Sequence, residues 1–185
     1  MSAADESVEV LDGEGRSVAV VTRGELRRGN LRHRAVYVLV VDLGGDSHPA
    51  PLRRRRLLVH RRAAWKDVYP GRWDVAFGGV VQAGESADET ARRELAEEAG
   101  IDAALRWLGG GRYEDTRARV FGDVYLAESE GPFTFSDGEV VETEWVELGG
   151  LRDWLARHEV CDDSVALSLP LLEARAGARG AGGSP

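Results

Sequence analysis

The stretch GVVQAGESADETARRELAEEAGI, residues 79–101, contains the local signals of one complete helix. Ser86 and Glu89 form a capping box, which predicts that the helix begins at Ala87. Gly100 stands where a left-handed cap ends a helix. Between these signals, apolar residues recur every four positions and form one stripe suited to pack on a sheet. The stripe consists of Ala87, Ala91, Leu95 and Ala99. We therefore expect a helix over 87–99 that lies close to its support, since most of the stripe is alanine.

The remaining surface of this predicted helix carries concentrated negative charge. Glu94, Glu97 and Glu98 are three and four residues apart, so their side chains share one face within a single turn. Like charges at that spacing repel, and two of the three lie near the helix C-terminus, where the dipole disfavours anions. A hard divalent cation such as Mg²⁺ prefers carboxylate oxygens and would remove this repulsion. The alternative is an ordinary solvated acidic face.

The whole stretch resembles the Nudix box, whose pattern is G-x5-E-x7-R-E-U-x-E-E-x-G-U, with U a bulky aliphatic residue. Every fixed position is filled at the right spacing. The matching residues are Gly79, Glu85, Arg93, Glu94, Leu95, Glu97, Glu98, Gly100 and Ile101. The resemblance implies an α/β fold, a Nudix-type α/β/α sandwich with a mixed β-sheet. It also implies Mg²⁺-dependent hydrolysis of a diphosphate linkage in a small molecule, a nucleoside diphosphate linked to a group X, with Mn²⁺ as a substitute metal.

The same resemblance implies roles for the individual residues of the box. Glu97 and Glu98 are expected to bind the metal. Glu94 is expected to be a further ligand or the base that orients the attacking water. Four other residues are expected to hold the loop and the helix in register. These are Gly79, Glu85, Arg93 and Gly100.

A downstream segment, residues 137–142, offers further acidic groups just before a predicted strand. Nudix proteins often place an additional metal ligand or base in such a loop. We therefore expect a carboxylate of this segment to take part in catalysis, with Glu142 assigned to the catalytic set and Glu139 as its neighbour to be tested beside it. A solvated turn is the equally weighted alternative.

Beyond the box, residues 31–101 resemble the branch of the family that contains isopentenyl-diphosphate isomerase. The segments that carry this resemblance are Leu31 to Ala35, Arg61-Arg62 with Lys66, and Tyr69 to Trp73. The resemblance implies that Arg62 and Lys66 bind the substrate diphosphate, Arg62 as a bidentate clamp and Lys66 as a point charge.

The isomerase places a catalytic cysteine just before the box glycine and a metal-binding histidine just after it. Gly78 and Val80 stand at those two positions here. An isomerase-like enzyme is therefore the second choice after a hydrolase. His33 matches another metal ligand of the isomerase, but without a histidine at position 80 we favour a structural role for it. The third alternative is a non-catalytic sensor of nucleotide diphosphates.

Two residues near the predicted clamp have open assignments. Trp73 is expected to contribute to substrate binding by stacking on a base or prenyl group, while a place in the core is at least as compatible with the sequence. Arg61 should point away from Arg62, because side chains alternate along a strand.

The rest of the chain predicts one layered α/β domain. We expect residues 1–6 to be flexible, 7–176 to form a single Nudix domain, and 177–185 to be a disordered tail of small residues. We expect Arg53–Arg56 to be part of a solvated loop. Predicted strands cover 8–11, 17–22, 35–42, 57–60, 74–77, 119–127 and 143–146, and predicted helices cover 151–157 and 164–174.

Composition narrows the class of protein. A chain of 185 residues fits one domain, and its net charge of −8 argues against broad nucleic-acid binding. The single cysteine, Cys161, permits no intramolecular disulfide. No apolar run reaches the length of a membrane span. We therefore expect a cytoplasmic protein whose partner is a small-molecule diphosphate substrate, with no nucleic acid and no membrane. Analogy with the family suggests a homodimer.

Overall fold

The computed structural model describes residues 3–44 and 52–178, and eight strands lie within that part of the chain. They are β1 (Ser7–Leu11), β2 (Ser17–Thr22), β3 (His33–Val41), β4 (Arg56–Arg62), β5 (Trp73–Asp74), β6 (Leu105–Glu114), β7 (Arg119–Glu128) and β8 (Val140–Glu147). The α-helices of the described part are α1 (Arg23–Arg28), α2 (Ala87–Ala99), α3 (Leu151–Leu155) and α4 (Asp162–Ala178). Short 3₁₀ turns cover Ala3–Asp5, Leu52–Arg54 and Leu148–Gly150.

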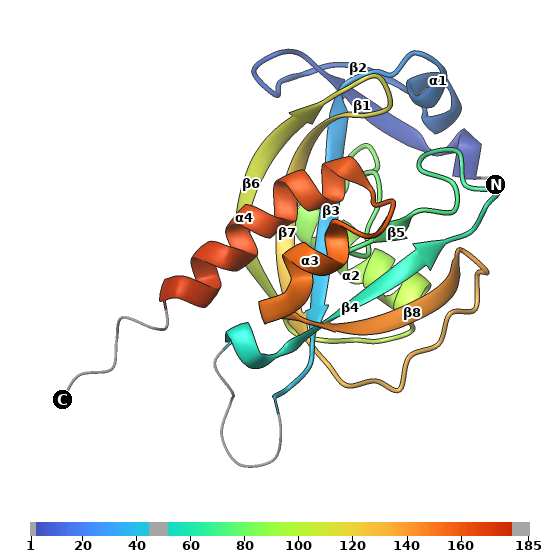
Figure 1. Ribbon diagram of the computed structural model, residues 1–185. Coiled ribbons are helices and arrows are strands. Elements are labelled where there is room, and N and C mark those ends of the chain that lie inside the picture. The colour runs from blue at the N-terminus through green and yellow to red at the C-terminus, as the bar shows by residue number, and fades with distance from the viewer. Residues whose placement is uncertain (1–2, 45–51, 179–185) are drawn as a thin grey trace.

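A mixed six-stranded sheet forms the centre of the molecule. Its order is β5-β4-β3-β7-β6, and β8 pairs with β4. Strands β3 and β7 run parallel, whereas the other pairs are antiparallel. Helices α3 and α4 cover one face, and α2 covers the other (Figure 1). The expected α/β sandwich with a mixed sheet is confirmed.

Helix α2 begins and ends where its sequence signals predict. Ser86 and Glu89 form the reciprocal capping box, and Gly100 has the left-handed φ of 68° that ends the helix. The alanine-rich stripe packs on alternate residues of β3 in one apolar cluster. The stripe residues buried there are Ala91, Leu95 and Ala99. This close packing brings the backbone of α2 near to the sheet and fixes the position of its acidic face.

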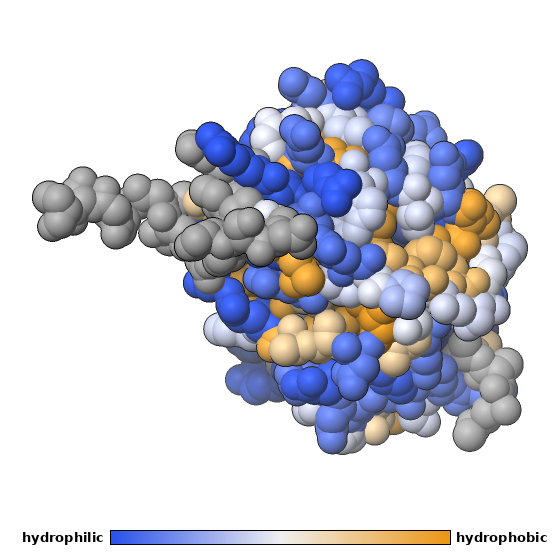
Figure 2. All heavy atoms as spheres, turned by 90° about the horizontal axis from the view of Figure 1, so that it is seen from below, coloured by the Kyte–Doolittle hydropathy of each residue, from blue (hydrophilic) through white to orange (hydrophobic). Residues whose placement is uncertain are grey.

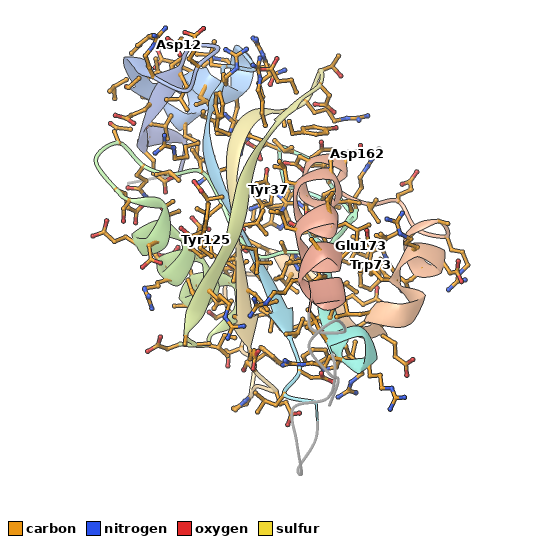
Figure 3. All side chains as sticks on the ribbon, turned by 90° about the vertical axis from the view of Figure 1, so that its left-hand side faces the viewer. Asp12, Tyr37, Trp73, Tyr125, Asp162 and Glu173 are labelled. Carbon is orange, nitrogen blue, oxygen red and sulfur yellow. The ribbon has the colours of Figure 1, made fainter. Side chains whose placement is uncertain are left out.

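The two faces of the sheet bury two separate clusters. Tyr37 belongs to the cluster beneath α3 and α4, and Tyr125 belongs to the cluster beneath α2. Figure 3 shows these two side chains on opposite sides of the sheet. Alternation along β3 explains the division, because successive residues of a strand point to opposite faces.

The predicted strand over 74–77 is shorter in the structure. Strand β5 ends at Asp74, whose Oδ1 accepts a hydrogen bond from the Ala76 amide at 3.2 Å. Such a side-chain bond to the backbone two residues on turns the chain and interrupts the ladder. Phe77 then makes only an isolated bridge with Val38.

Two elements have no counterpart in the sequence-based prediction. Helix α1 begins with a capping box of Thr22 and Glu25, and β6 contains the run Gly109–Gly111. Glycine weakens a strand on its own. In β6 the backbone pairing with β7 holds the glycine run in the strand. Leucine side chains of α4 occupy the space that Cβ atoms of this run would need.

The expectation of a solvated loop over Arg53–Arg56 agrees with the exposed Arg54 but is wrong for Arg55 and Arg56. Arg55 is buried and pairs with Glu128 at 3.1 Å, while Arg56 lies in β4 and pairs with Asp42 at 2.7 Å. Buried charges need partners, and these carboxylates come from the ends of β3 and β7, far away in sequence.

Both chain ends differ in part from the expected disorder. Ala3–Asp5 form a 3₁₀ turn, and α4 continues to Ala178, so residues 177 and 178 are helical. The rest of the predicted tail, 179–185, lies outside the described residues.

The surface is mostly polar on the face that Figure 2 shows, where hydrophobic groups lie between hydrophilic ones. Trp65 and Trp107 are among the large apolar side chains that are well exposed. Within residues 3–44 and 52–178, no helix is both long and apolar enough to cross a membrane.

Candidate active site

The acidic face of α2 lies against the backbone of a two-glycine segment. Glu98 is buried and accepts a hydrogen bond from the Gly78 amide at 3.1 Å. Glu94 is also buried and faces Gly79, where a Cβ atom would stand 2.6 Å from its Oε1. A side chain at position 79 would therefore displace a carboxylate, which explains why glycine is needed there. Glu97, the third acid, is exposed.

Arg93 connects the loop before α2 to the acidic face. Its guanidinium donates two hydrogen bonds to Glu85, both at 3.0 Å, in a bidentate arrangement. It also contacts Glu94 at 2.8 Å and Glu97 at 3.2 Å. These bonds lower the pKa of Glu85. The geometry is that of a group that holds the loop and helix in register.

Burial destabilises the charged forms of the two buried carboxylates. Burial raises the pKa of Glu94, although Arg93 opposes the rise. Burial also raises the pKa of Glu98 well above its usual range, and the negative charge of Glu94 adds to that rise. Both effects favour a cation beside these two groups.

Lys66 faces the same carboxylates from the loop after β4. Its ammonium is largely buried and forms an ion pair with Glu139. Burial alone would raise the pKa of Glu139, but the bond and charge of Lys66 keep it below its usual value. Glu139 also lies within reach of Glu98.

Arg62 and Arg61 point in opposite directions, as the strand geometry requires. Arg62 is largely buried and lies 3.6 Å from Asp74, with its Nε donating to the carbonyl of Val68 at 3.3 Å. Arg61 is half exposed and pairs with Glu142 at 3.7 Å.

The structure does not bring two of the predicted residues to this place. Glu142 pairs with Arg61 and does not line the cavity in front of α2. Trp73 packs edge-on against Trp154, with ring centroids 5.3 Å apart, and contacts the apolar cluster beneath α3. Its position is that of the core alternative.

A cavity of about 1010 Å³, open to solvent, lies in front of the acidic face. The acids of α2 and Glu139 line it together with basic side chains from α1, β4 and the loop after β4. The basic residues are Arg23, Arg27, Arg62 and Lys66. Sequence reasoning missed the two arginines of α1. The signal for them was the capping box Thr22-x-x-Glu25, which predicts a helix with both arginines on one face.

The donor set suits a hard divalent cation. Glu94, Glu97, Glu98 and Glu139 are among the carboxylates that line the cavity beside a glycine backbone, and burial raises the pKa of Glu98. Among the residues that the structure describes, no three acidic, histidine or cysteine side chains already form a closed metal cluster. An open set of this kind agrees with Mg²⁺, which usually takes one or two protein carboxylates and completes its shell with water and phosphate oxygens.

His33 lies at the start of β3, away from the carboxylates. Its Nδ1 is 2.9 Å from the carbonyl oxygen of Leu31, and burial lowers its pKa to about 4. The ring is therefore neutral, with its Nδ1–H donating to that carbonyl.

Comparison with known sequences gives consistent relatives. Residues 31–165 match the NUDIX domain family. The chain is 38% identical over 146 residues to the uncharacterized Nudix hydrolase YfcD of Escherichia coli K12. The aligned region covers 78% of this chain and 75% of the relative. It is 35% identical over 166 residues to the uncharacterized Nudix hydrolase PA4841 of Pseudomonas aeruginosa. This second alignment covers 86% of this chain and 89% of that protein.

Comparison with solved structures gives the same fold. The crystal structure of DR0079 from Deinococcus radiodurans matches with a TM-score of 0.69 and 24% identity, over 92% of this chain and 97% of that one. The MutT protein of Methanosarcina mazei matches with a TM-score of 0.61 and 23% identity, over 80% of this chain and 95% of that one. Identities this low support the fold alone.

Proposed function

The chain belongs to the Nudix hydrolase family, and from that membership we propose that it uses Mg²⁺ to hydrolyse the diphosphate linkage of a nucleoside diphosphate joined to a group X. The observation that carries this proposal is the pair of buried carboxylates, Glu94 and Glu98, held against the Gly78–Gly79 backbone. Two like charges in a desolvated place lose stability unless a cation joins them. The basic side chains that line the same cavity suit a polyanionic substrate.

The metal, the acidic residues and the basic residues of the cavity have different roles in this proposal. Mg²⁺, with Mn²⁺ as a substitute, supplies electrostatic stabilisation of the phosphoryl oxygens and activation of the attacking water. Glu97 and Glu98 hold the metal, and Glu94 is a further ligand or accepts the proton of the water. Arg62 and Lys66 bind oxygens of the diphosphate.

A second carboxylate outside the helix is a candidate base. Of the two acids of the downstream segment, Glu139 lines the cavity beside Glu98, whereas Glu142 pairs with Arg61 outside it. The position of Glu139 supports that residue over Glu142. Lys66 keeps the carboxylate of Glu139 ionised, and displacement of Lys66 by the diphosphate would raise the pKa of Glu139 and make it a stronger proton acceptor.

The backbone of Gly78 argues against isomerase chemistry. A Cβ atom built there would overlap the carbonyl oxygen of Val36 and lie 2.8 Å from its carbonyl carbon. The φ of +153° is also one that residues with side chains rarely adopt. This backbone therefore has no room for the cysteine that the isomerase carries at the same place.

The test is hydrolysis of a panel of nucleotide sugars, dinucleotides, nucleoside triphosphates and prenyl diphosphates, with Mg²⁺, Mn²⁺ or a chelator. We expect a nucleoside monophosphate and a phosphorylated X as products, with turnover that stops on chelation. Binding without turnover would indicate a sensor. Conversion of isopentenyl diphosphate without phosphate release would indicate an isomerase.

A further inference from the structure

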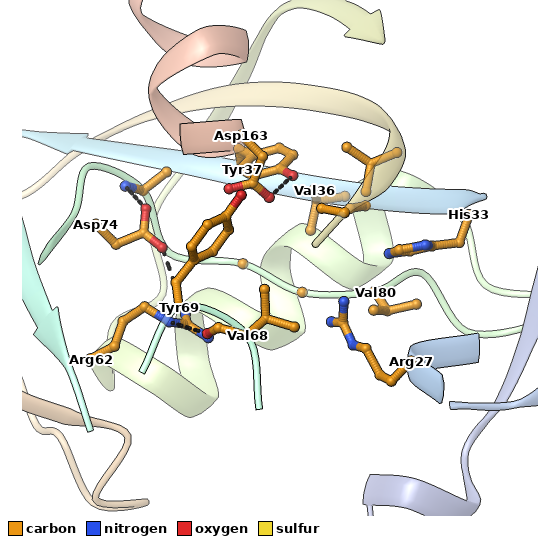
Figure 4. A pocket seen from close by; sticks show the side chains of 16 residues that line it. Arg27, His33, Val36, Tyr37, Arg62, Val68, Tyr69, Asp74, Val80 and Asp163 are labelled. Atoms are coloured by element: carbon orange, nitrogen blue, oxygen red, sulfur yellow. Dashed lines mark hydrogen bonds and ion pairs between the residues drawn. The ribbon is translucent and has the colours of Figure 1, made fainter. Parts of the chain in front are cut away.

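Arg62 lies between two cavities. It lines the cavity in front of the acidic face of α2, here called the catalytic cavity, and also a second cavity that shares the Gly78–Gly79 segment with it. Figure 4 shows this second cavity, which we call the inner chamber, and its volume is about 520 Å³ including the space open to solvent. The orientation of the Arg62 guanidinium therefore decides whether it can reach a diphosphate in the catalytic cavity.

Two contacts hold the guanidinium of Arg62 from the side of the inner chamber. Its Nε donates a hydrogen bond to the carbonyl of Val68 at 3.3 Å, and its Nη1 forms an ion pair with Oδ2 of Asp74 at 3.6 Å (Figure 4). Both partners line the inner chamber, and neither lines the catalytic cavity. Among the described residues, none accepts a hydrogen bond from Nη2, so its donors remain available to a ligand.

Asp74 is itself fixed by its surroundings. It ends β5, and its neighbour Trp73 makes two backbone hydrogen bonds to the segment before α4. The amide of Trp73 donates to the carbonyl of Glu159 at 2.9 Å, and its carbonyl accepts from the amide of Cys161 at 2.8 Å. The side chain of Asp74 is buried, and its Oδ1 accepts a hydrogen bond from the Ala76 amide at 3.2 Å. A carboxylate held in this way can fix the position of its partner.

The charge of Asp74 compensates that of Arg62. Burial alone would lower the pKa of Arg62, but the negative charge of Asp74 raises it above its usual value. A largely buried cation needs such a partner. The counter-ion of Lys66 is Glu139, which lines the catalytic cavity, where a phosphate would compete with it. The counter-ion of Arg62 lies outside that cavity, so a phosphate could bind Arg62 without displacing it.

We propose that Asp74 is a positioning residue for the substrate diphosphate, because it holds Arg62 in the orientation that leaves its free donors available to the catalytic cavity before the substrate arrives. An arginine side chain has many rotamers, and ordering it during binding weakens affinity. A partner that orders it in advance removes this cost. The inference rests on the proposed function, since it takes Arg62 to be a ligand of the diphosphate.

The binding test uses methylenediphosphonate, a non-hydrolysable analogue of pyrophosphate, with Mg²⁺ in isothermal titration calorimetry. We expect Asp74→Asn to raise the Kd by about tenfold and Arg62→Ala to raise it at least as much. The double variant should bind no more weakly than Arg62→Ala alone, because Asp74 acts through Arg62. An unchanged Kd in Asp74→Asn, or losses that multiply in the double variant, would overturn the inference.

Asp42→Asn is the matched control for a merely structural effect. Asp42 is also buried and also pairs with an arginine of β4, Arg56, at 2.7 Å, but it lines neither cavity. Both substitutions should lower Tm, and only Asp74→Asn should weaken binding of the analogue. Equal weakening in the two variants would show that Asp74 acts on stability alone.

A measurement on the wild type covers the case in which Asp74→Asn does not fold. The Nε–H signal of Arg62 in ¹⁵N NMR, assigned by its loss in Arg62→Lys, should be sharp and protected from solvent exchange in the free protein. A signal that becomes protected only when methylenediphosphonate is added would show that the ligand orders Arg62, and would refute the inference.

Kinetics separate this inference from the proposed function. Asp74→Asn should raise KM for the hydrolysed nucleotide by about tenfold and leave kcat within about twofold. If binding of the analogue depends on Asp74 but no substrate of the panel is hydrolysed, the positioning role stands and the hydrolase proposal fails. If hydrolysis occurs and neither KM nor the Kd of the analogue depends on Asp74, the positioning role alone fails.

Discussion

Replacing Gly78 with alanine tests whether the backbone at the centre of the site excludes every side chain. The new Cβ atom would overlap the carbonyl oxygen of Val36, in the buried strand β3. Overpacking of this kind costs about 1–3 kcal/mol. Forcing a residue with a side chain into a φ of +153° adds about 1–3 kcal/mol. The free energy of unfolding should therefore fall by about 2–6 kcal/mol.

Two other glycines separate these contributions. Gly84 also has a positive φ, +84°, but a Cβ atom there would meet nothing within 4 Å, so Gly84→Ala should cost only about 1–2 kcal/mol. Gly150 has open space and no positive φ, so Gly150→Ala should be nearly neutral. A domain of this size loses about 2–4 °C in Tm per kcal/mol. The midpoints of the two ranges differ by about 2.5 kcal/mol, so we expect Gly78→Ala to melt about 5–10 °C below Gly84→Ala.

Thermal unfolding followed by circular dichroism gives all three Tm values in one buffer. Activity should fall with stability in Gly78→Ala, because the amide that holds Glu98 must move. If Gly78→Ala and Gly84→Ala melt within about 2 °C of each other, the close approach to Val36 is unimportant and a cysteine at position 78 would be admissible.

Other predictions concern the charged groups and the chain end. Glu98→Gln should cut turnover by about 10² or more while the fold persists, measured by steady-state kinetics; an unchanged rate would remove Glu98 from the metal site. Because the raised pKa of Glu98 makes the folded state hold its proton, stability with a chelator should fall as pH rises through that pKa, and Glu98→Gln should flatten the fall in urea titrations at several pH values. Arg62→Ala and Lys66→Ala should each raise KM by the equivalent of about 1–3 kcal/mol, with Arg61→Ala much weaker; three equally small effects would contradict the clamp. Deleting the chain from Gly177 onward should leave Tm and activity unchanged, and a large drop in either would show that the segment contributes.

Helix α2 could be predicted from the sequence because all its determinants are local. Ser86, Glu89 and Gly100 act on the backbone within a few residues of themselves, and the stripe follows from helical periodicity. The common face of Glu94, Glu97 and Glu98 follows from the same periodicity. The burial of Glu94 and Glu98, in contrast, comes from the Gly78–Gly79 segment, which only the folded sheet brings beside them.

Features that depend on distant partners could not be predicted in this way. Arg55 is buried because it pairs with Glu128, which lies on another strand. The run of arginines around Arg55 does not indicate such a partner, so the sequence could not predict its burial. The choice between Glu139 and Glu142 depends on which carboxylate faces the cavity. Glu139 precedes β8 and pairs with Lys66, whereas Glu142 lies within β8 and pairs with Arg61, and both partners come from a part of the chain far away in sequence.

The contacts of Arg93 have a consequence for the order in which the catalytic site fills. Its guanidinium pairs with Glu94 and Glu97, so the Mg²⁺ of the proposed reaction would meet carboxylates that already have a counter-ion. The metal would have to compete with the Arg93 guanidinium, which is covalently part of the chain and therefore always present beside the carboxylates. A free ion competes poorly on those terms, whereas an ion that arrives with the diphosphate brings additional oxygen ligands of its own. In the proposed reaction, Arg93 would therefore hold Glu94 and Glu97 in place until metal and substrate bind together.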